Sequence, residues 1–292
     1  MDSDPRRSET LYLTLDIESD YGRSDSYEIL SQAAPFIDWL HAENIPLTAF
    51  VVGKLFQQGH SIIDTFLRAG ISLGVHGFSH SPDTFGTMYA SHADEIQKGM
   101  EAFEKRVGRK PDGYRAALGI VSRDDVLLMD KLGFCYDASI FPMHRSHCYD
   151  FSGLPKSPFQ WQGTKLVEIP LGMLTAALPA GMTFINLLGS ELSAFLVKQQ
   201  VSSLSGNDKA FHVTDLHFHN LFPYYPAMNS LPFIMRLVYQ AGSIVGGFAT
   251  LRRYVAVLRS KGFVFGNLET DVLSLRRESL PVVGLDCFNR ML

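Results

Sequence analysis

The chain has 292 residues and a net charge of −4, and 46% of its residues are hydrophobic. This length suits one large α/β domain or two small ones, with enough apolar residues for a full core. The weak negative charge, without any basic run longer than two residues, excludes an extended nucleic-acid surface. Three cysteines without a CxxC pair argue against a disulfide framework and a thiolate zinc site. The first ten residues hold no apolar signal segment, so we expect a cytoplasmic protein.

Strands and helices are predicted to alternate along the chain. The pattern gives strand 11–15, helix 27–41, strand 46–53, helix 61–69, strand 71–75, helix 93–107, strand 112–116, helix 123–132, strands 134–137, 166–170 and 209–219, helix 251–260 and strand 262–268. Three of the helices end at a glycine that leads into a strand, at Gly70, Gly133 and Gly262. Glycine readily takes the left-handed conformation that closes a helix. Alternation of this kind predicts a parallel sheet.

Polar side chains at the ends of five predicted strands favour a barrel over an open sheet. They are Asp16, Glu18, His76, His80, Arg115, Asp137, His217 and His219. A (β/α) barrel collects its functional residues at the C-terminal ends of its strands, whereas an open sheet gathers them mainly at one switch point. We therefore expect a single barrel domain over residues 8–275 with apolar insertions, followed by a C-terminal tail over 276–292.

Two carboxylates follow the first predicted strand. Asp16 and Glu18 are two residues apart, which places both side chains on one side of an extended chain. Acidic residues after a strand often cap the next helix, and that alternative stays open. Neither residue stands at the start of a predicted helix, which favours a chemical role.

Two histidines follow the third predicted strand. His76 and His80 are spaced so that both rings can face one ion, although single histidines are more often ordinary surface or core residues. Two histidines and a carboxylate form a ligand set for a divalent metal that leaves coordination positions open for water. The second carboxylate can then act as a base, so the four residues together predict metal-assisted hydrolysis.

Arg115 and Asp137 lie on short predicted strands. A buried arginine needs a carboxylate partner, so Arg115 forms either a structural ion pair or a contact that holds Asp16 in place. Asp137 is either a site residue or a helix cap or turn former.

The strand 209–219 carries two further histidines on one face. Either His217 or His219 could be a general acid, and Asp215 could orient one of them. A hydrogen-bonded pair without a catalytic role is the alternative.

Taken in order, five segments resemble the motifs of the NodB-type polysaccharide deacetylases, which form carbohydrate esterase family four. They are LTLDIESD at 13–20, HGFSH at 76–80, GYRAALG at 113–119, YDASIFP at 136–142 and HFHN at 217–220. The isoleucine between the two acids matches the Asp-x-Glu/Asp subgroup. The resemblance covers residues 11 to 270 and implies a distorted (β/α)7 barrel.

The resemblance also implies catalytic roles. Asp16 would be the general base, and Arg115 would hold its carboxylate. His219, with His217 as its competitor, would protonate the departing amine. The segment that carries Asp137 would close the site.

The metal ligands implied by the resemblance are Glu18, His76 and His80, and the ion expected there is Zn²⁺. The arginine motif of the family usually continues with proline, where this chain has Ala116 and Ala117. A backbone N–H near Leu118 would bind the oxyanion. The subgroup also includes metal-free amidohydrolases that act on small cyclic substrates.

Two apolar segments, at 170–189 and 231–251, are expected as insertions in the barrel. They either pack on it or form an apolar rim for a lipid-linked sugar at the inner membrane surface. We expect a metal-dependent hydrolase that removes an acetyl or formyl group from the nitrogen of a sugar precursor of a cell-surface glycan. The alternatives are a metal-free hydrolase of cyclic amides and a catalytically inactive sugar-binding barrel.

Overall fold

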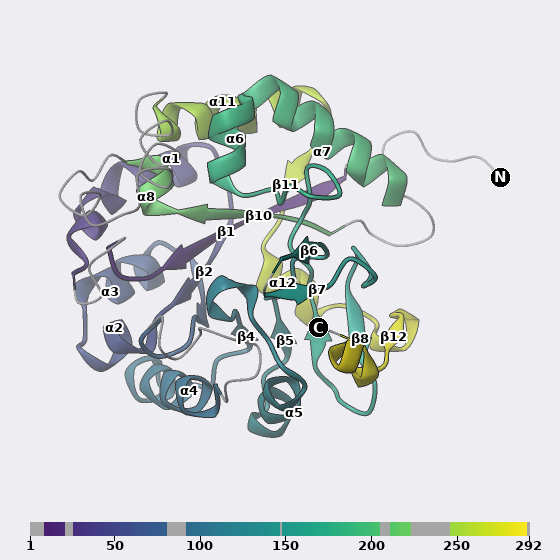
Figure 1. Ribbon diagram of the computed structural model, residues 1–292. Coiled ribbons are helices and arrows are strands. Elements are labelled where there is room, and N and C mark those ends of the chain that lie inside the picture. The colour runs from purple at the N-terminus through teal and green to yellow at the C-terminus, as the bar shows by residue number, and fades with distance from the viewer. Residues whose placement is uncertain are drawn as a thin grey trace.

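The structure is a computed structural model that describes residues 9–20, 26–80, 92–146, 148–204, 211–222 and 246–290. The strands are β1 (Thr10–Ile17), β2 (Leu47–Val51), β3 (Ser72–Val75), β4 (Gly113–Tyr114), β5 (Tyr136–Asp137), β6 (His144–Arg145), β7 (Tyr149–Asp150), β8 (Phe159–Trp161), β9 (Val167–Glu168), β10 (His212–His217), β11 (Val264–Phe265) and β12 (Val282–Val283). The α-helices are α1 (Ala33–Ala42), α2 (Gly53–Gln57), α3 (Ser61–Arg68), α4 (Ala93–Val107), α5 (Arg123–Leu132), α6 (Met182–Leu188), α7 (Ser190–Leu204), α8 (Phe218–Leu221), α11 (Gly247–Ser260) and α12 (Leu268–Leu273) (Figure 1). Short 3₁₀ helices are η1 (Glu28–Gln32), η2 (Ala117–Gly119), η3 (Arg277–Ser279) and η4 (Leu285–Arg290).

Apart from the β6–β7 hairpin, the described strands form one main sheet that curves without closing into a barrel. Its parallel part runs in the order β10, β1, β2, β3, β4, β5, β9, and β8 and β12 extend it beyond β9. In the described part of the chain no strand ladder joins β9 to β10. The Gly172 amide instead donates to the Val213 carbonyl at 2.9 Å, and the Asp215 amide donates to the Ala180 carbonyl at 3.0 Å. The predicted single α/β domain is thus confirmed, with a barrel that its strands do not close.

Alternation along β1 separates two apolar layers. Leu11, Leu13 and Leu15 belong to the larger cluster, which contains the core residues of the surrounding helices. Tyr12 belongs to a smaller cluster inside the curved sheet, together with residues such as Phe50. Because side chains alternate along a strand, Thr14 and Asp16 share the inner side with Tyr12. The inner face of β1 therefore changes from apolar to polar towards its C-terminal end.

Several predicted boundaries are confirmed. Helices α4 and α5 have the predicted bounds, and α5 begins at a capping box in which Ser122 and Asp125 bond each other's backbone amides. Gly70, Gly133 and Gly262 have φ angles of +69°, +92° and +93°, all in the left-handed region that glycine favours. Helix 27–41 is interrupted, since η1 precedes α1.

The predicted strand 209–219 is wrong at its C-terminal end. β10 ends at His217, and the chain turns there into the short helix α8, which contains His219. The two histidines therefore do not alternate along one strand face. The sequence pattern also missed α6 and α7, which follow β9.

The apolar segment 170–189 mostly packs into the core, where Leu171, Met182 and Ile185 are buried. Most of the second segment, residues 231–245, lies outside the described residues. Within the described ranges we find no helix that is both long and apolar enough to cross a membrane.

The residues after 275 continue along the edge of the sheet. β12 pairs in parallel with β8, and the centre of the Phe288 ring lies 5.1 Å from the centre of the Trp161 ring. The division into a domain over 8–275 and a tail over 276–292 stays a prediction.

Candidate active site and metal-binding residues

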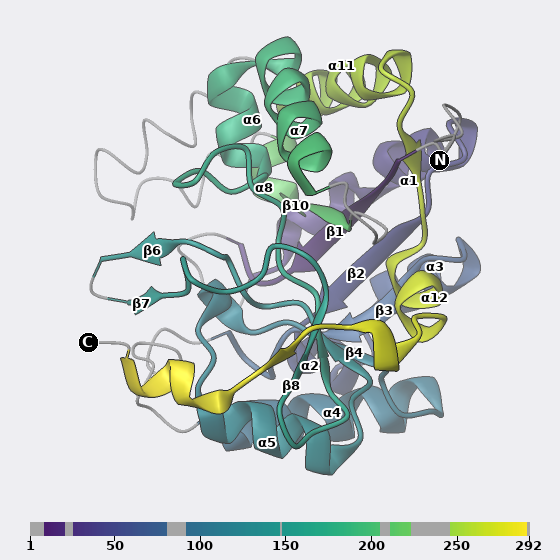
Figure 2. The same ribbon diagram turned by 90° about the vertical axis from the view of Figure 1, so that its right-hand side faces the viewer.

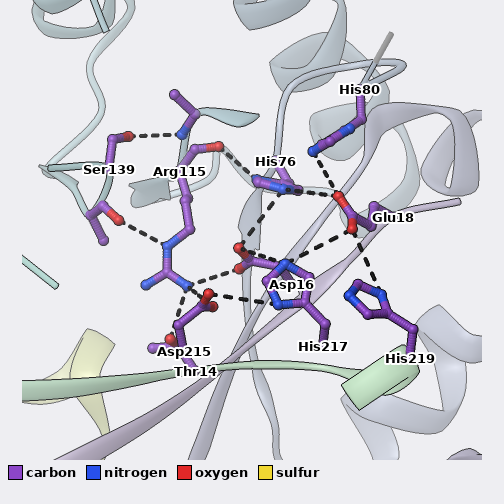
Figure 3. Close-up of polar contacts among 12 residues, drawn as sticks. Thr14, Asp16, Glu18, His76, His80, Arg115, Ser139, Asp215, His217 and His219 are labelled. Carbon is purple, nitrogen blue, oxygen red and sulfur yellow. Dashed lines mark hydrogen bonds and ion pairs between the residues drawn. The ribbon is translucent and has the colours of Figure 1, made fainter. Parts of the chain in front are cut away.

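The register of the parallel strands brings the predicted site residues to one end of the sheet. Asp16 on β1 is paired with His217 on β10. On the other side of β1, Val75 at the end of β3 pairs with Tyr114 on β4, so His76 and Arg115 leave neighbouring strands together. Figure 3 shows these side chains around the carboxylates of Asp16 and Glu18.

Glu18, His76 and His80 offer three donor atoms that lie within 4.8 Å of one another. The Glu18 Oε2 atom is 2.6 Å from His80 Nε2 and 3.9 Å from His76 Nε2. One carboxylate and two imidazoles are a common zinc ligand set, with donor–metal distances of about 2.0–2.2 Å. The three residues therefore fit a divalent ion that contacts one atom of each.

The protonation of His76 and Glu18 suits metal binding. His76 Nδ1 lies 2.9 Å from the Arg115 carbonyl, and because a carbonyl only accepts, Nδ1 carries the proton and Nε2 is left for the ion. Burial lowers the pKa of His76 to about 4 and keeps the ring neutral. Burial opposes ionisation of Glu18, but the charge and hydrogen bond of His80 hold the pKa of Glu18 well below its usual value.

A buried glutamate on α4 fixes the loop between the two histidines. Glu95 Oε2 accepts the amides of Phe78 and Ser79 at 2.9 and 2.7 Å, and Glu95 Oε1 accepts the Ser79 hydroxyl at 2.7 Å. The loop ends at His80, whose φ of +53° is uncommon for a residue other than glycine. Sequence reasoning missed Glu95, because an acidic residue in the first turn of a helix looks like an ordinary favourable charge at that end.

Arg115 joins three strands at the floor of the site. Its Nη1 atom donates to Asp16 Oδ1 at 2.8 Å, to Thr14 Oγ1 at 2.8 Å and to Asp215 Oδ1 at 3.2 Å. Its Nε atom donates to the Ala138 carbonyl at 2.8 Å. Although burial raises the pKa of Asp16, the charge of Arg115 and the nearby histidines lower it overall. Asp16 is therefore held ionised, with Oδ2 directed to the imidazoles.

The two remaining histidines differ in their surroundings. His217 Nδ1 is 3.6 Å from Asp215 Oδ2, and His219 Nδ1 is 4.0 Å from Glu18 Oε1. Burial acts against a charge on His217, but the nearby carboxylates, Asp215 first, raise its pKa. Burial and the charge of His217 lower the pKa of His219 to about 3. Of the two histidines, His217 therefore holds a proton more readily than His219.

Asp137 does not join this group. It is fully buried, its Oδ1 atom accepts the Ser139 hydroxyl at 2.5 Å, and it does not line the site cavity. The Ser139 oxygen in turn accepts the Ala116 amide at 2.7 Å. Asp137 thus supports the loop after Arg115 from behind, and its predicted catalytic role stays a prediction.

A cavity of about 370 Å³ opens above these residues. Its floor carries the acids and imidazoles already described. Its walls are largely apolar, and they include Leu118, Phe141, Met143, Met182 and Phe184. Such a cavity, with a few convergent polar groups, is the usual form of a small-molecule site.

Comparisons with known proteins agree with the family resemblance. Residues 3–136 match the family model described as polysaccharide deacetylase. The peptidoglycan deacetylase-like protein FGM2 of Gibberella zeae is 29% identical over 107 residues. This alignment covers 34% of the chain and 31% of FGM2, so it spans about a third of that relative. The resemblance to the deacetylase family is confirmed.

Solved structures share the fold over most of the chain. One is a protein from Pseudomonas aeruginosa PAO1 that has been assigned as a polysaccharide deacetylase, with a TM-score of 0.63, 15% identity, and coverage of 92% of this chain and 91% of the other. Another is the allantoinase Puue, with a TM-score of 0.63, 14% identity, and coverage of 92% and 90%.

Proposed function

We propose that the chain is a metal-dependent hydrolase that removes an acetyl or formyl group from the nitrogen of a sugar, because residues 3–136 match the family model described as polysaccharide deacetylase. The observation that carries this proposal is the placement of Asp16 beside the Glu18, His76 and His80 donor set at the floor of one cavity. A divalent ion bound there, which we expect to be Zn²⁺, supplies Lewis-acid activation of water and of the amide carbonyl.

Asp16 acts as the general base. Arg115 occupies Oδ1 of the carboxylate, while Oδ2 lies 3.8 Å from His76 Nε2 on the side of the donor set. The proton of the attacking water therefore passes to Oδ2. The fixed carboxylate needs no reorientation before it accepts that proton.

A histidine protonates the nitrogen as the tetrahedral intermediate collapses. The contact with Asp215 and the raised pKa favour His217 for this role, with His219 as the competitor. The oxyanion is served by a backbone amide near Leu118, because the amides of Ala116 and Gly119 are already engaged by Ser139 and by the Ala116 carbonyl. Leu118 lines the cavity with a φ of +59°, a strained conformation of the kind found at functional sites.

The substrate we propose is a lipid-linked precursor of a cell-surface glycan, reached from the inner membrane surface. Helices α6 and α7 expose Leu187, Leu192 and Phe195, at 52%, 46% and 50%. Phe184 lines the cavity and lies three residues before Leu187 on α6, so these two apolar residues are neighbours on the surface of that helix. A polyprenyl or acyl chain is the occupant that such apolar residues beside the cavity fit.

Release of acetate or formate from N-acylated sugars tests the proposed function. We expect release that stops after chelation and returns when Zn²⁺ is added. Release that survives full removal of metal, with a cyclic amide as the better substrate, would favour the metal-free alternative. Complete inactivity of the metal-loaded protein on sugar and cyclic amides would favour the inactive barrel.

A further inference from the structure

We propose that Arg145 binds an anionic group, a phosphate or a carboxylate, on the same sugar whose amide is hydrolysed. This inference rests on the proposed function and adds a charge requirement to its substrate. Arg145 lies on β6 of the β6–β7 hairpin, which Figure 2 shows projecting on the same side of the molecule as α6. Residues of both elements line the site cavity.

The cavity has two arginines among its lining residues, and they differ in what they bind. Arg115 is buried at the floor and bonds the carboxylates of Asp16 and Asp215. Arg145 is exposed to solvent and forms no ion pair with any carboxylate in the described part of the chain. The acid of its own hairpin, Asp150, lies 3.6 Å from His144 instead.

Contacts of Arg145 hold its side chain at the cavity wall. Its Nη1 atom donates to the Leu118 carbonyl at 3.2 Å, and Arg145 is paired across the hairpin with Tyr149, which also lines the cavity. A guanidinium has five N–H donors in a planar fork, so donors remain after these contacts. That fork matches the oxygen spacing of a carboxylate or a phosphate.

The neighbours of Arg145 strengthen the case for an anion. Phe141, Met143 and Phe184 line the same cavity and exclude water when a substrate fills it. A lower local dielectric strengthens the attraction between an arginine and an anion, whereas a neutral sugar gains much less from that charge. An anionic substrate would also be repelled by the acids at the floor unless a cation faced its charged group.

Binding measured by calorimetry tests the inference without any hydrolysis. The probes are glucose 1-phosphate, glucuronic acid and neutral glucose, each titrated into the metal-loaded wild type, Arg145→Ala, Arg145→Lys and the control Arg68→Ala. Arg68 is an exposed arginine in the last turn of α3, before β3 begins, and therefore lies at the opposite end of the sheet.

We expect Arg145→Ala to weaken binding of at least one anionic probe by about tenfold or more, as for a lost hydrogen bond to a charged group. Arg145→Lys should fall between the alanine variant and the wild type, and Arg68→Ala should match the wild type. The anionic probe that loses more affinity identifies the group as phosphate or carboxylate. Equal binding of both anions by the wild type and Arg145→Ala would overturn the inference.

A kinetic comparison then links the anion site to the reaction. We compare kcat/KM for N-acetylglucosamine 1-phosphate with kcat/KM for N-acetylglucosamine. The ratio of the first to the second should fall in Arg145→Ala, because KM for the phosphorylated sugar rises. The ratio should stay at the wild-type value in Arg68→Ala. An unchanged ratio would contradict the inference. If none of the proteins hydrolyses either sugar, the proposed function fails while the calorimetry still decides the role of Arg145.

Discussion

Arg115 and Asp16 form a buried ion pair in which one nitrogen, Nη1, lies 2.8 Å from Oδ1 of the carboxylate. The same guanidinium bonds the Ala138 carbonyl through Nε and packs 4.3 Å from the centre of the Phe50 ring. These two contacts fix the arginine independently of its ion pair with Asp16. This arrangement leaves Oδ2 as the atom that can take a proton.

Asp16→Asn should remove turnover and keep the bound metal. The amide still bonds Arg115 but cannot accept the proton, so kcat should fall by about 10²–10⁴-fold, the usual contribution of a general base. Steady-state kinetics together with metal analysis of the same sample check this. A variant with nearly wild-type kcat would show that another group is the base.

Glu95→Gln should weaken metal binding although Glu95 is not proposed as a ligand. The neutral amide accepts the backbone amides of Phe78 and Ser79 less strongly, so His76 and His80 are held less firmly. We expect affinity for Zn²⁺ to fall by about 10–100-fold, the usual effect of removing a group that orients metal ligands. Competition with a chelating dye measures it. Glu101→Gln, at an exposed position of the same helix, is the matched control, and equal affinity in both variants would refute the role.

Asp137 and Glu168 should make stability depend on pH. Both carboxyl groups are fully buried, and burial raises the pKa of Asp137 to about 7 and that of Glu168 well above its usual value. The folded protein then keeps protons that the unfolded chain has lost, so the free energy of unfolding falls as pH rises from the ordinary carboxyl range towards 7.

Glu168→Gln should flatten that dependence, because its amide can bond Asp137 without a shared proton. Urea unfolding midpoints at about pH 5 and about pH 7 check this, and the wild type should lose more stability between them than the variant does. Identical losses in the two proteins would mean that this pair does not titrate as its burial implies.

Leu192→Glu combined with Phe195→Glu should abolish binding to lipid vesicles. The two residues are three apart on α7 and share one exposed face, where charges oppose insertion into a bilayer. Vesicle flotation compares this variant with the wild type. If neither protein floats with the vesicles and both fully hydrolyse a water-soluble sugar, Leu192 and Phe195 do not form a membrane-binding surface.

How much of the site the sequence predicts depends on where each residue stands. Asp16 lies at the C-terminal end of β1 and His76 directly follows β3. The parallel sheet places strand ends together, so their grouping follows from local pattern. Glu95 and Ser139 act through backbone amides of distant loops, which no periodicity records. The turn at His217 was missed because the apolar and polar alternation of β10 continues into α8 without a glycine, a proline or a capping residue.

In the fold, too, some elements follow from the local sequence pattern and others depend on packing. Helices α4 and α5 were predicted with their bounds, because each has one apolar face and ends at a glycine. α7 has apolar residues on several sides, so a helical period does not stand out, and its place is set by packing against α11 and α6. The gap between β9 and β10 depends on the contacts of Gly172 and Ala180, which are visible only in three dimensions.

Metal stoichiometry is the most direct test of the account. Elemental analysis should find one divalent ion per chain in the wild type and in His41→Ala, whose histidine is exposed at the end of α1. His80→Ala should lower the bound metal by more than about tenfold, since even the loss of a supporting group costs that much. Unchanged stoichiometry in His80→Ala would contradict the assignment of Glu18, His76 and His80 as the metal site.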